Sequence, residues 1–191
     1  DCSQSRLRDI LKPNMARSPL ITILLLAAST AAAPACGPIR NREVTTIEIE
    51  APAAKVWDIV GRYDDLSWTG RIAKTSATGG TVPETTRRTL VFHSGAVFTD
   101  TLIAYDRAAR SLTFRTDDED VKEMPVEGYT SKITVTEENG RTRVEWRGAF
   151  SRSYLKSDPP PEQSDEAAIK AVAAFQKEAL ASLKQKLEHG S

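Results

Sequence analysis

Apolar and polar residues alternate on both sides of Asn139-Gly140, over residues 124–151. Asn-Gly is typical of a two-residue type I′ turn, in which both residues take positive φ, and such a turn joins two antiparallel strands. The turn pairs Glu138 with Arg141, and alternation then places one set of side chains on a single face. That set is Tyr129, Ser131, Ile133, Val135, Val144, Trp146, Gly148 and Phe150. Charged and hydroxyl residues occupy the other face, which predicts a sheet with one buried and one solvated side.

The middle of this buried face carries little side-chain volume. Ser131 lies opposite Gly148 in the predicted register, and the Tyr129 hydroxyl is close by. A buried hydroxyl needs a partner, because leaving it unpaired costs about 1–3 kcal/mol. The hairpin alone leaves two interpretations open. Either a side chain from a neighbouring helix fills this notch, or the notch is the wall of a small-molecule pocket.

Further strands and one short helix are predicted before the hairpin. The predicted strands are Val44–Glu50, Thr86–Phe92, Val97–Tyr105 and Ser111–Thr116. The short helix begins at Ala51-Pro52, since proline suits a first turn, and ends at Gly61. A short helix or loop follows at 62–70.

A long helix is predicted at the C-terminal end of the chain. Ser164 is a good N-cap, and Asp165 and Glu166 follow where the helix dipole favours acidic residues. One apolar face is formed by Ile169, Val172, Phe175, Ala179 and Leu183, at steps of three and four residues. A helix of over 20 residues is about 30 Å long, enough to cross a whole sheet.

These elements predict an α+β fold, in which a curved antiparallel sheet of six to seven strands wraps around the long C-terminal helix. Strands around one helix cannot close as tightly as two sheets packed face to face, so we expect a hollow at the open ends of the sheet. This architecture favours the pocket interpretation of the notch.

The N-terminal region has the pattern of an export signal. Residues 15–35 combine a basic start, the apolar run "LITILLLAA" and small residues, so we interpret them as a signal peptide. Residues 1–14 precede its start and are interpreted as upstream or non-native sequence. The domain then covers 44–187, with a linker at 36–43 and a tail at 188–191. The protein is expected in the cell envelope, periplasmic or lipid-anchored.

Cys36 has two interpretations. "APAC" resembles the lipobox of bacterial lipoproteins, which predicts lipidation at Cys36; the alternative is cleavage after Ala35 and release of a soluble protein. Cys36 would be the one cysteine left after cleavage, so no intrachain disulfide is expected. A lipid on Cys36 is the one membrane attachment that we expect.

The charge pattern narrows the class of partner. The chain has 191 residues, with 26 basic and 26 acidic side chains, and its formal net charge is +0. Because no basic stripe is present, nucleic acid is not an expected partner.

Four stretches in this order resemble the helix-grip, START-like (SRPBCC) superfamily, often labelled polyketide cyclase/dehydrase. Its members include the major birch-pollen allergen and the plant abscisic-acid receptors. The stretches are "EIEAPAAKVWDIVGRYDDLSWTG", "TDTLIAYDRAARSLTFR", "VEGYTSKITVTEENGRTRVEW" and the final helix, and the resemblance covers about residues 44–187. It implies a fold far more specifically than an activity, since function depends on sites placed on folds.

The resemblance implies a ligand site inside the sheet. Asp100 matches the position from which the hormone receptors send an acidic side chain into the cavity. The alternation of 97–103 allows this face or the opposite one to point inward, and the resemblance selects the first. The predicted ligand-binding residues are Phe92, Phe98, Asp100, Tyr129, Ser131, Trp146, Phe150 and Phe175. His93, Ser94 and Gly95 resemble a gate loop, and "EMPVEG" a second loop at the mouth. The basic ligand anchor of the receptors has no clear counterpart, which counts against a carboxylate ligand.

Candidates for catalysis are few. His93 could act as a base at the mouth, and Asp100 with Tyr129 could form an acid–base pair, but we predict no catalytic residue, metal or other cofactor. The favoured function is an exported protein that binds or carries a hydrophobic small molecule, lipid or polyketide-like. The alternatives are an enzyme of the cyclase or dehydratase kind, and a periplasmic accessory protein that acts on a protein partner, like the family member associated with methanol oxidation.

Overall fold

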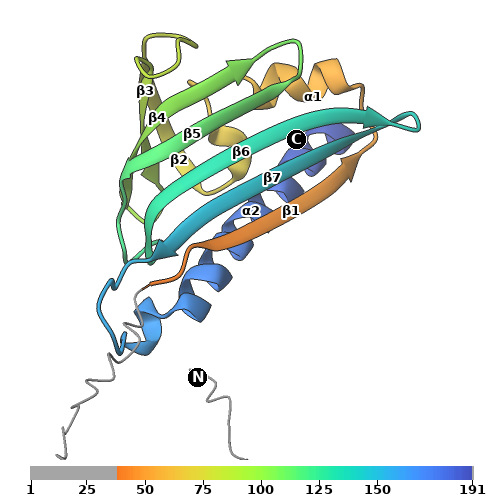
Figure 1. Ribbon diagram of the computed structural model, residues 1–191. Coiled ribbons are helices and arrows are strands. Elements are labelled where there is room, and N and C mark those ends of the chain that lie inside the picture. The colour runs from red at the N-terminus through yellow and green to blue at the C-terminus, as the bar shows by residue number, and fades with distance from the viewer. Residues whose placement is uncertain (1–37, 191) are drawn as a thin grey trace, which may run out of the picture. The chain divides into compact units, whose positions relative to one another are not determined.

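The computed structural model describes residues 38–190. These residues form one antiparallel sheet of seven strands in the order β1-β7-β6-β5-β4-β3-β2 (Figure 1). The strands are β1 (Asn41–Ile49), β2 (Ile72–Thr78), β3 (Arg87–Phe92), β4 (Val97–Asp106), β5 (Ser111–Asp118), β6 (Val126–Glu138) and β7 (Arg141–Arg152). The predicted signal peptide, the first fourteen residues and Cys36 lie outside the described residues.

Helices cover one face of this sheet. They are α1 (Ala53–Val60) and the long α2 (Asp165–His189), with short 3-10 turns η1 (Ser67–Thr69) and η2 (Pro161–Gln163). Figure 1 shows the sheet bending around α2, which packs against β1, β7 and η1. The predicted helix-grip α+β fold is therefore confirmed. None of the described helices is both long and apolar enough to cross a membrane.

The hairpin has the register that its turn predicted. Asn139 and Gly140 both have positive φ, 54° and 77°, and Ser131 faces Gly148 across β6 and β7. A bulge interrupts the ladder between Glu127 and Thr130, which leaves Tyr129 in the interior against Phe150, with 6.0 Å between ring centroids.

Four details differ from the predictions. Strand β2 was not predicted, because "IAKTSAT" has a single large apolar residue and forms an edge strand that buries little besides Ile72. Strand β1 begins at Asn41, inside the segment taken as a linker, and α2 continues into the predicted tail. Ile169 is 37% exposed, and the small Ala168 is buried in its place.

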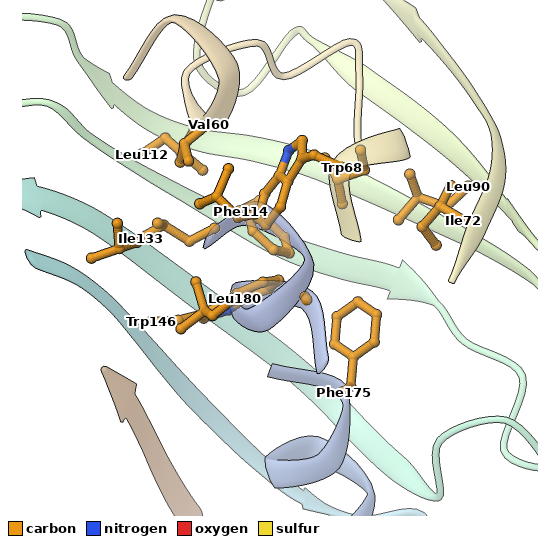
Figure 2. Close-up of a cluster of buried hydrophobic side chains, with 14 of the residues drawn as sticks. Val60, Trp68, Ile72, Leu90, Leu112, Phe114, Ile133, Trp146, Phe175 and Leu180 are labelled. Carbon is orange, nitrogen blue, oxygen red and sulfur yellow. The ribbon is translucent and has the colours of Figure 1, made fainter. Parts of the chain in front are cut away.

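Aromatic rings from the sheet and the helices meet in the core (Figure 2). Trp146 of β7 lies 5.5 Å from Phe175 of α2 and 6.0 Å from Trp68 of η1, between ring centroids. Phe114 of β5 adds an edge contact to Trp146 at 6.5 Å. Trp68 is 3% exposed and lies among these rings, which places it in the core.

The start of α2 is fixed to the sheet. The Ser164 side chain accepts a hydrogen bond from the Ala167 amide, as its N-cap position predicts. Asp165 in the first turn accepts from Asn41 of β1 at 2.8 Å and from Arg152 of β7 at 2.5 Å. The first turn of α2 is therefore held beside the first residue of β1 and the last residue of β7.

Ser164→Ala is expected to lower the free energy of unfolding by about 0.5–2 kcal/mol, because it removes the acceptor that caps α2. Ser157→Ala, at an exposed serine of the preceding linker, is the matched control and should change little. Urea denaturation of both variants measures the difference. Equal effects at the two positions would contradict a capping role.

Candidate functional site

A small cavity lies between strands β3 to β6 and helix α2. Five predicted ligand-binding residues line it: Phe92, Phe98, Asp100, Tyr129 and Phe175. Its other lining residues are Leu66, Arg88, Leu90, Phe114, Thr116 and Met124. The volume is about 20 Å³, room for about one water molecule, whereas small-molecule pockets hold roughly 300–1,000 Å³. The expectation of an open, ligand-sized hollow is therefore wrong for this structure.

Larger depressions are open to solvent. The largest of those described, about 480 Å³, lies at the hairpin turn beside Glu50, Asn139 and Arg141. It touches none of the predicted site residues, so the interior remains the candidate site.

The notch on the hairpin is filled by a helix side chain. A Cβ added at Gly148 would lie 2.8 Å from the Tyr129 ring and 2.9 Å from Gln176 Nε2 of α2. Gln176 donates to the Tyr129 hydroxyl at 3.2 Å and accepts from Thr45 at 2.9 Å. The filled-core interpretation is correct for this position, and the polar tips that suggested a pocket are paired with one another.

Three predicted site residues are buried but do not line the cavity. Ser131 accepts a hydrogen bond from the Trp146 indole at 2.8 Å, so its hydroxyl is paired within the sheet. Phe150 packs on Tyr129. Because these side chains do not line the cavity, their role in ligand binding stays a prediction.

The polar corner of the cavity is built by three neighbouring strands. Arg88 of β3 faces Asp100 of β4, and Asp100 faces Thr116 of β5 in the strand registers. Arg88 Nε donates to Asp100 Oδ2 at 2.8 Å, and the Thr116 hydroxyl donates to Oδ1 at 2.8 Å. Phe98 and Leu102 are buried on the same face of β4 as Asp100, so the inward alternation implied by the resemblance is the observed one.

Two aromatic rings lie against Arg88. Its guanidinium carbon is 4.2 Å from the Tyr63 ring centroid and 4.3 Å from that of Phe114. Arg88 and Asp100 are 2% and 1% exposed, so the pair is held in a nearly dry environment. Removing one partner of such a pair costs about 3–5 kcal/mol, because the other charge stays buried without compensation.

Arg88 was not among the predicted site residues, although the sequence carries a signal for it. Arg88, Leu90 and Phe92 alternate along the strand and share one face. An arginine in register with two buried apolar residues indicates a buried cation that needs an acidic partner. The cavity therefore contains a basic residue, contrary to the expectation that no counterpart of a basic anchor is present.

The proposed acid–base pair is not assembled. Burial raises the pKa of the Asp100 carboxyl, while Arg88 and the Thr116 hydroxyl oppose that rise. Burial also raises the pKa of the Tyr129 phenol to about 12, so this hydroxyl stays protonated at neutral pH. Within residues 38–190 the two side chains make no hydrogen bond to each other, and each is occupied by other partners.

Two loops meet at the mouth of the cavity. His93, Ser94 and Gly95 are exposed in the loop between β3 and β4. Ser94 donates to Glu123 of the β5–β6 loop at 2.7 Å, and Arg71 donates to the same carboxylate at 2.6 Å. Met124, next to Glu123, lines the cavity. The two loops predicted to lie at the mouth are thus joined over it, and their action as a gate stays a prediction.

Glu119 is a second acidic group near this end of the sheet. Its carboxylate accepts a hydrogen bond from the Gly128 amide at 3.0 Å. Partial burial, with the nearby charge of Glu127, raises the pKa of the Glu119 carboxyl to about 7. Glu119 therefore changes its charge close to neutral pH.

The comparisons with known proteins agree with this fold. Residues 42–188 match the family described as "Polyketide cyclase / dehydrase and lipid transport". The chain belongs to this family. Members of this family have a fold that binds hydrophobic ligands. No curated protein matches the chain.

Solved structures of other proteins have a similar fold. The protein XoxI from Bacillus cereus is 25% identical, with a TM-score of 0.66 over 78% of this chain and 96% of its own. A protein from Nitrosospira multiformis is 23% identical, with a TM-score of 0.64 over 78% and 98%. The ginseng major latex-like protein 151 from Panax ginseng is 12% identical, with a TM-score of 0.61 over 78% and 97%. The last two likenesses show the shared fold alone.

Gly148→Ala is expected to lower the free energy of unfolding by about 1–3 kcal/mol, because its methyl group would overlap Tyr129 and Gln176 in a closed core. The same change should cost less in a Gln176→Ala background, which makes room for the methyl group. A double-mutant cycle by urea denaturation measures this coupling. Equal costs in both backgrounds would show that Gln176 does not fill the notch.

Glu119→Gln is expected to stabilise the protein more at pH 8 than at pH 5. The pKa of Glu119 is raised from its ordinary value of 4.5 to about 7 in the folded chain, so ionisation lowers stability as pH rises through this interval. Glutamine keeps an acceptor for the Gly128 amide and removes the charge. Thermal unfolding against pH checks this, with exposed Glu137→Gln as control; a variant parallel to wild type across the range would contradict it.

Proposed function

We propose that this protein is exported and that it binds or carries a hydrophobic small molecule, lipid or polyketide-like, in the interior between α2 and strands β3 to β6. The observation that carries this proposal is the cavity itself, whose walls are mainly apolar and aromatic, with a polar corner formed by Arg88, Asp100 and Thr116. A few fixed polar groups in an apolar wall are typical of small-molecule sites. The family description, which includes lipid transport, supports the same class of ligand.

Binding requires the cavity to expand from its closed volume. The contacts that close the mouth are Ser94 and Arg71 with Glu123, and Arg71 is about one-third exposed. Partly exposed ion pairs contribute about 0–1 kcal/mol each, so this closure is inexpensive to open. Met124 beneath it is flexible and adapts to irregular apolar shapes.

Export is supported by the sequence pattern of residues 15–35 and by the small residues before Cys36. A carrier in the cell envelope would meet apolar molecules that need protection from water. Lipidation of Cys36 would hold it at the membrane surface.

The enzyme alternative has less support from the geometry. Asp100 is paired with Arg88 and Thr116, and the Tyr129 hydroxyl with Gln176, so neither is aligned for proton transfer to a bound molecule. Binding alone needs no such alignment.

Met124→Ala is expected to strengthen binding of the apolar fluorophore N-phenyl-1-naphthylamine, because it enlarges the cavity at its lining. Leu112→Ala is the matched control, since Leu112 is equally buried but does not line the cavity. Fluorescence titration should give one saturable site in wild type and a lower dissociation constant in Met124→Ala. Organic extraction of protein from its native host, followed by mass spectrometry, should find a co-purified apolar compound.

Two outcomes would contradict the proposal. One is the absence of both a saturable site and an extracted compound. The other is an equal gain in Met124→Ala and Leu112→Ala, which would mean that the fluorophore reports a loosened core and not this cavity.

A further inference from the structure

A group of basic side chains lies on the outer face of the sheet, away from α2. Arg147 of β7 is directly opposite Lys132 of β6, and Val44 of β1 faces Arg147 from the other side. Arg42 precedes Val44 by two residues on the same face of β1 and lies opposite Ala149. The three basic side chains are exposed. Because like charges directly opposite one another in a sheet are destabilising, a bound anion would relieve a cost that this arrangement carries.

Acidic side chains on this face leave most of the positive charge uncompensated. Arg147 Nε lies 2.5 Å from Glu145 Oε1, so Arg147 has an acidic partner. Glu48, the other nearby carboxylate of β1 on this face, pairs with Arg141 at the far end of the strand. Among the residues that the structure describes, Arg42 and Lys132 form no ion pair. The face therefore has a local excess of positive charge in a chain whose formal net charge is +0.

The three basic side chains surround a depression of about 390 Å³ that is open to solvent. Its floor is formed by the shorter side chains of Val44, Thr130 and Ala149 and by the main chain between them. Glu43 also lines it, but its side chain alternates with those of Arg42 and Val44 and belongs to the face toward α2. The depression is therefore apolar at its floor and positively charged at its rim.

The open shape of this depression favours a lipid headgroup over a free small molecule. Small-molecule sites bury most of the ligand surface, which an open depression cannot do. A headgroup stays attached to its bilayer and needs no enclosure, while lysine and arginine attract its phosphate by charge. Val44, which is 53% exposed, adds an apolar side chain at the same place.

The start of the domain places this face within reach of a membrane in the proposed lipid-anchored form. Cys36 precedes Asn41, the first residue of β1, by five residues. Five residues span at most about 18 Å when fully extended. A lipid on Cys36 would therefore hold Arg42 close to the bilayer surface.

We propose that the depression at Arg42, Lys132 and Arg147 docks the protein on a membrane by binding the anionic phosphate of a phospholipid headgroup. This interaction goes beyond the proposed function, since it needs no ligand in the interior and shares with it only export as the route to a membrane. Docking here would also bring the mouth of the cavity near the bilayer, because Thr130 follows Met124 by six residues along the chain.

Sedimentation of the full chain with lipid vesicles tests this proposal. Wild type should bind vesicles of equal parts phosphatidylcholine and phosphatidylglycerol more tightly than vesicles of phosphatidylcholine alone. Each basic residue near an anionic surface strengthens binding about fivefold, so Arg42→Gln/Lys132→Gln/Arg147→Gln should weaken it by at least about 25-fold. Raising the salt concentration from about 0.1 M to about 1 M should also weaken wild-type binding, because the Debye length falls from about 10 Å to about 3 Å.

A second triple variant is the matched control. Lys55→Gln/Arg107→Gln/Lys177→Gln removes the same total charge from exposed positions elsewhere on the protein and should bind anionic vesicles as wild type does. The apolar run near the N-terminus is the same in every variant, so differences between variants report the outer face. Both triple variants should leave the titration of the interior with N-phenyl-1-naphthylamine unchanged.

Three outcomes would overturn membrane docking at this face. One is equal binding of wild type to both kinds of vesicle. Another is an equal loss in the two triple variants, which would mean that net charge and not this depression controls binding. The third is saturable binding of glycerol phosphate in solution without binding to anionic vesicles, which would make the depression a site for a free phosphate ester. The fluorophore titration judges ligand binding in the interior separately in each case.

Discussion

The structure depends on α2 filling the concave side of one bent sheet. A seven-stranded sheet with a single buried face has no second sheet to cover it, so the helix must supply the missing volume. Phe175 brings an aromatic ring against Trp146, and Gln176 enters the space that Gly148 leaves open. Because the interior of a folded protein is close-packed, this fit leaves a cavity of about 20 Å³.

The polar groups buried by this packing differ in whether their hydrogen bonds are satisfied within the protein. Around Gln176, the Thr45 hydroxyl and the Tyr129 hydroxyl are satisfied within the protein, and Ser131 is paired with Trp146. Three buried polar atoms have no partner among the described residues: Arg88 Nη2, the Tyr63 hydroxyl and the Trp68 indole nitrogen. Buried polar groups are almost always paired in native structures, so the unpaired Arg88 donor, which also lines the cavity, is an exception.

Sequence patterns predicted the parts of this arrangement that are local. The Asn139-Gly140 turn determined the register of β6 and β7, and the spacing of Val172, Phe175, Ala179 and Leu183 identified the buried face of α2. Contacts between distant elements were beyond reach. The spacing of Gln176 from Val172 and Ala179 places it on the buried face of α2, but its partner Thr45 lies 131 residues away in the sequence. The buried pair was within reach, because alternation in β3 places Arg88 inward, but matching it to Asp100 needed the β3–β4 register.

The hydrogen bonds on the two sides of the cavity also determine which side opens more easily. Moving α2 away from the hairpin would break the bonds of Gln176 and leave buried groups unpaired, at about 1–3 kcal/mol for each. Opening the mouth breaks the contacts of Glu123 with Ser94 and Arg71, whose groups return to water; a partly exposed ion pair of this kind contributes about 0–1 kcal/mol. In the proposed function, therefore, a ligand enters between the two loops while the helix keeps its place on the sheet, and it meets Phe175 and Met124 before it reaches the polar corner at Arg88.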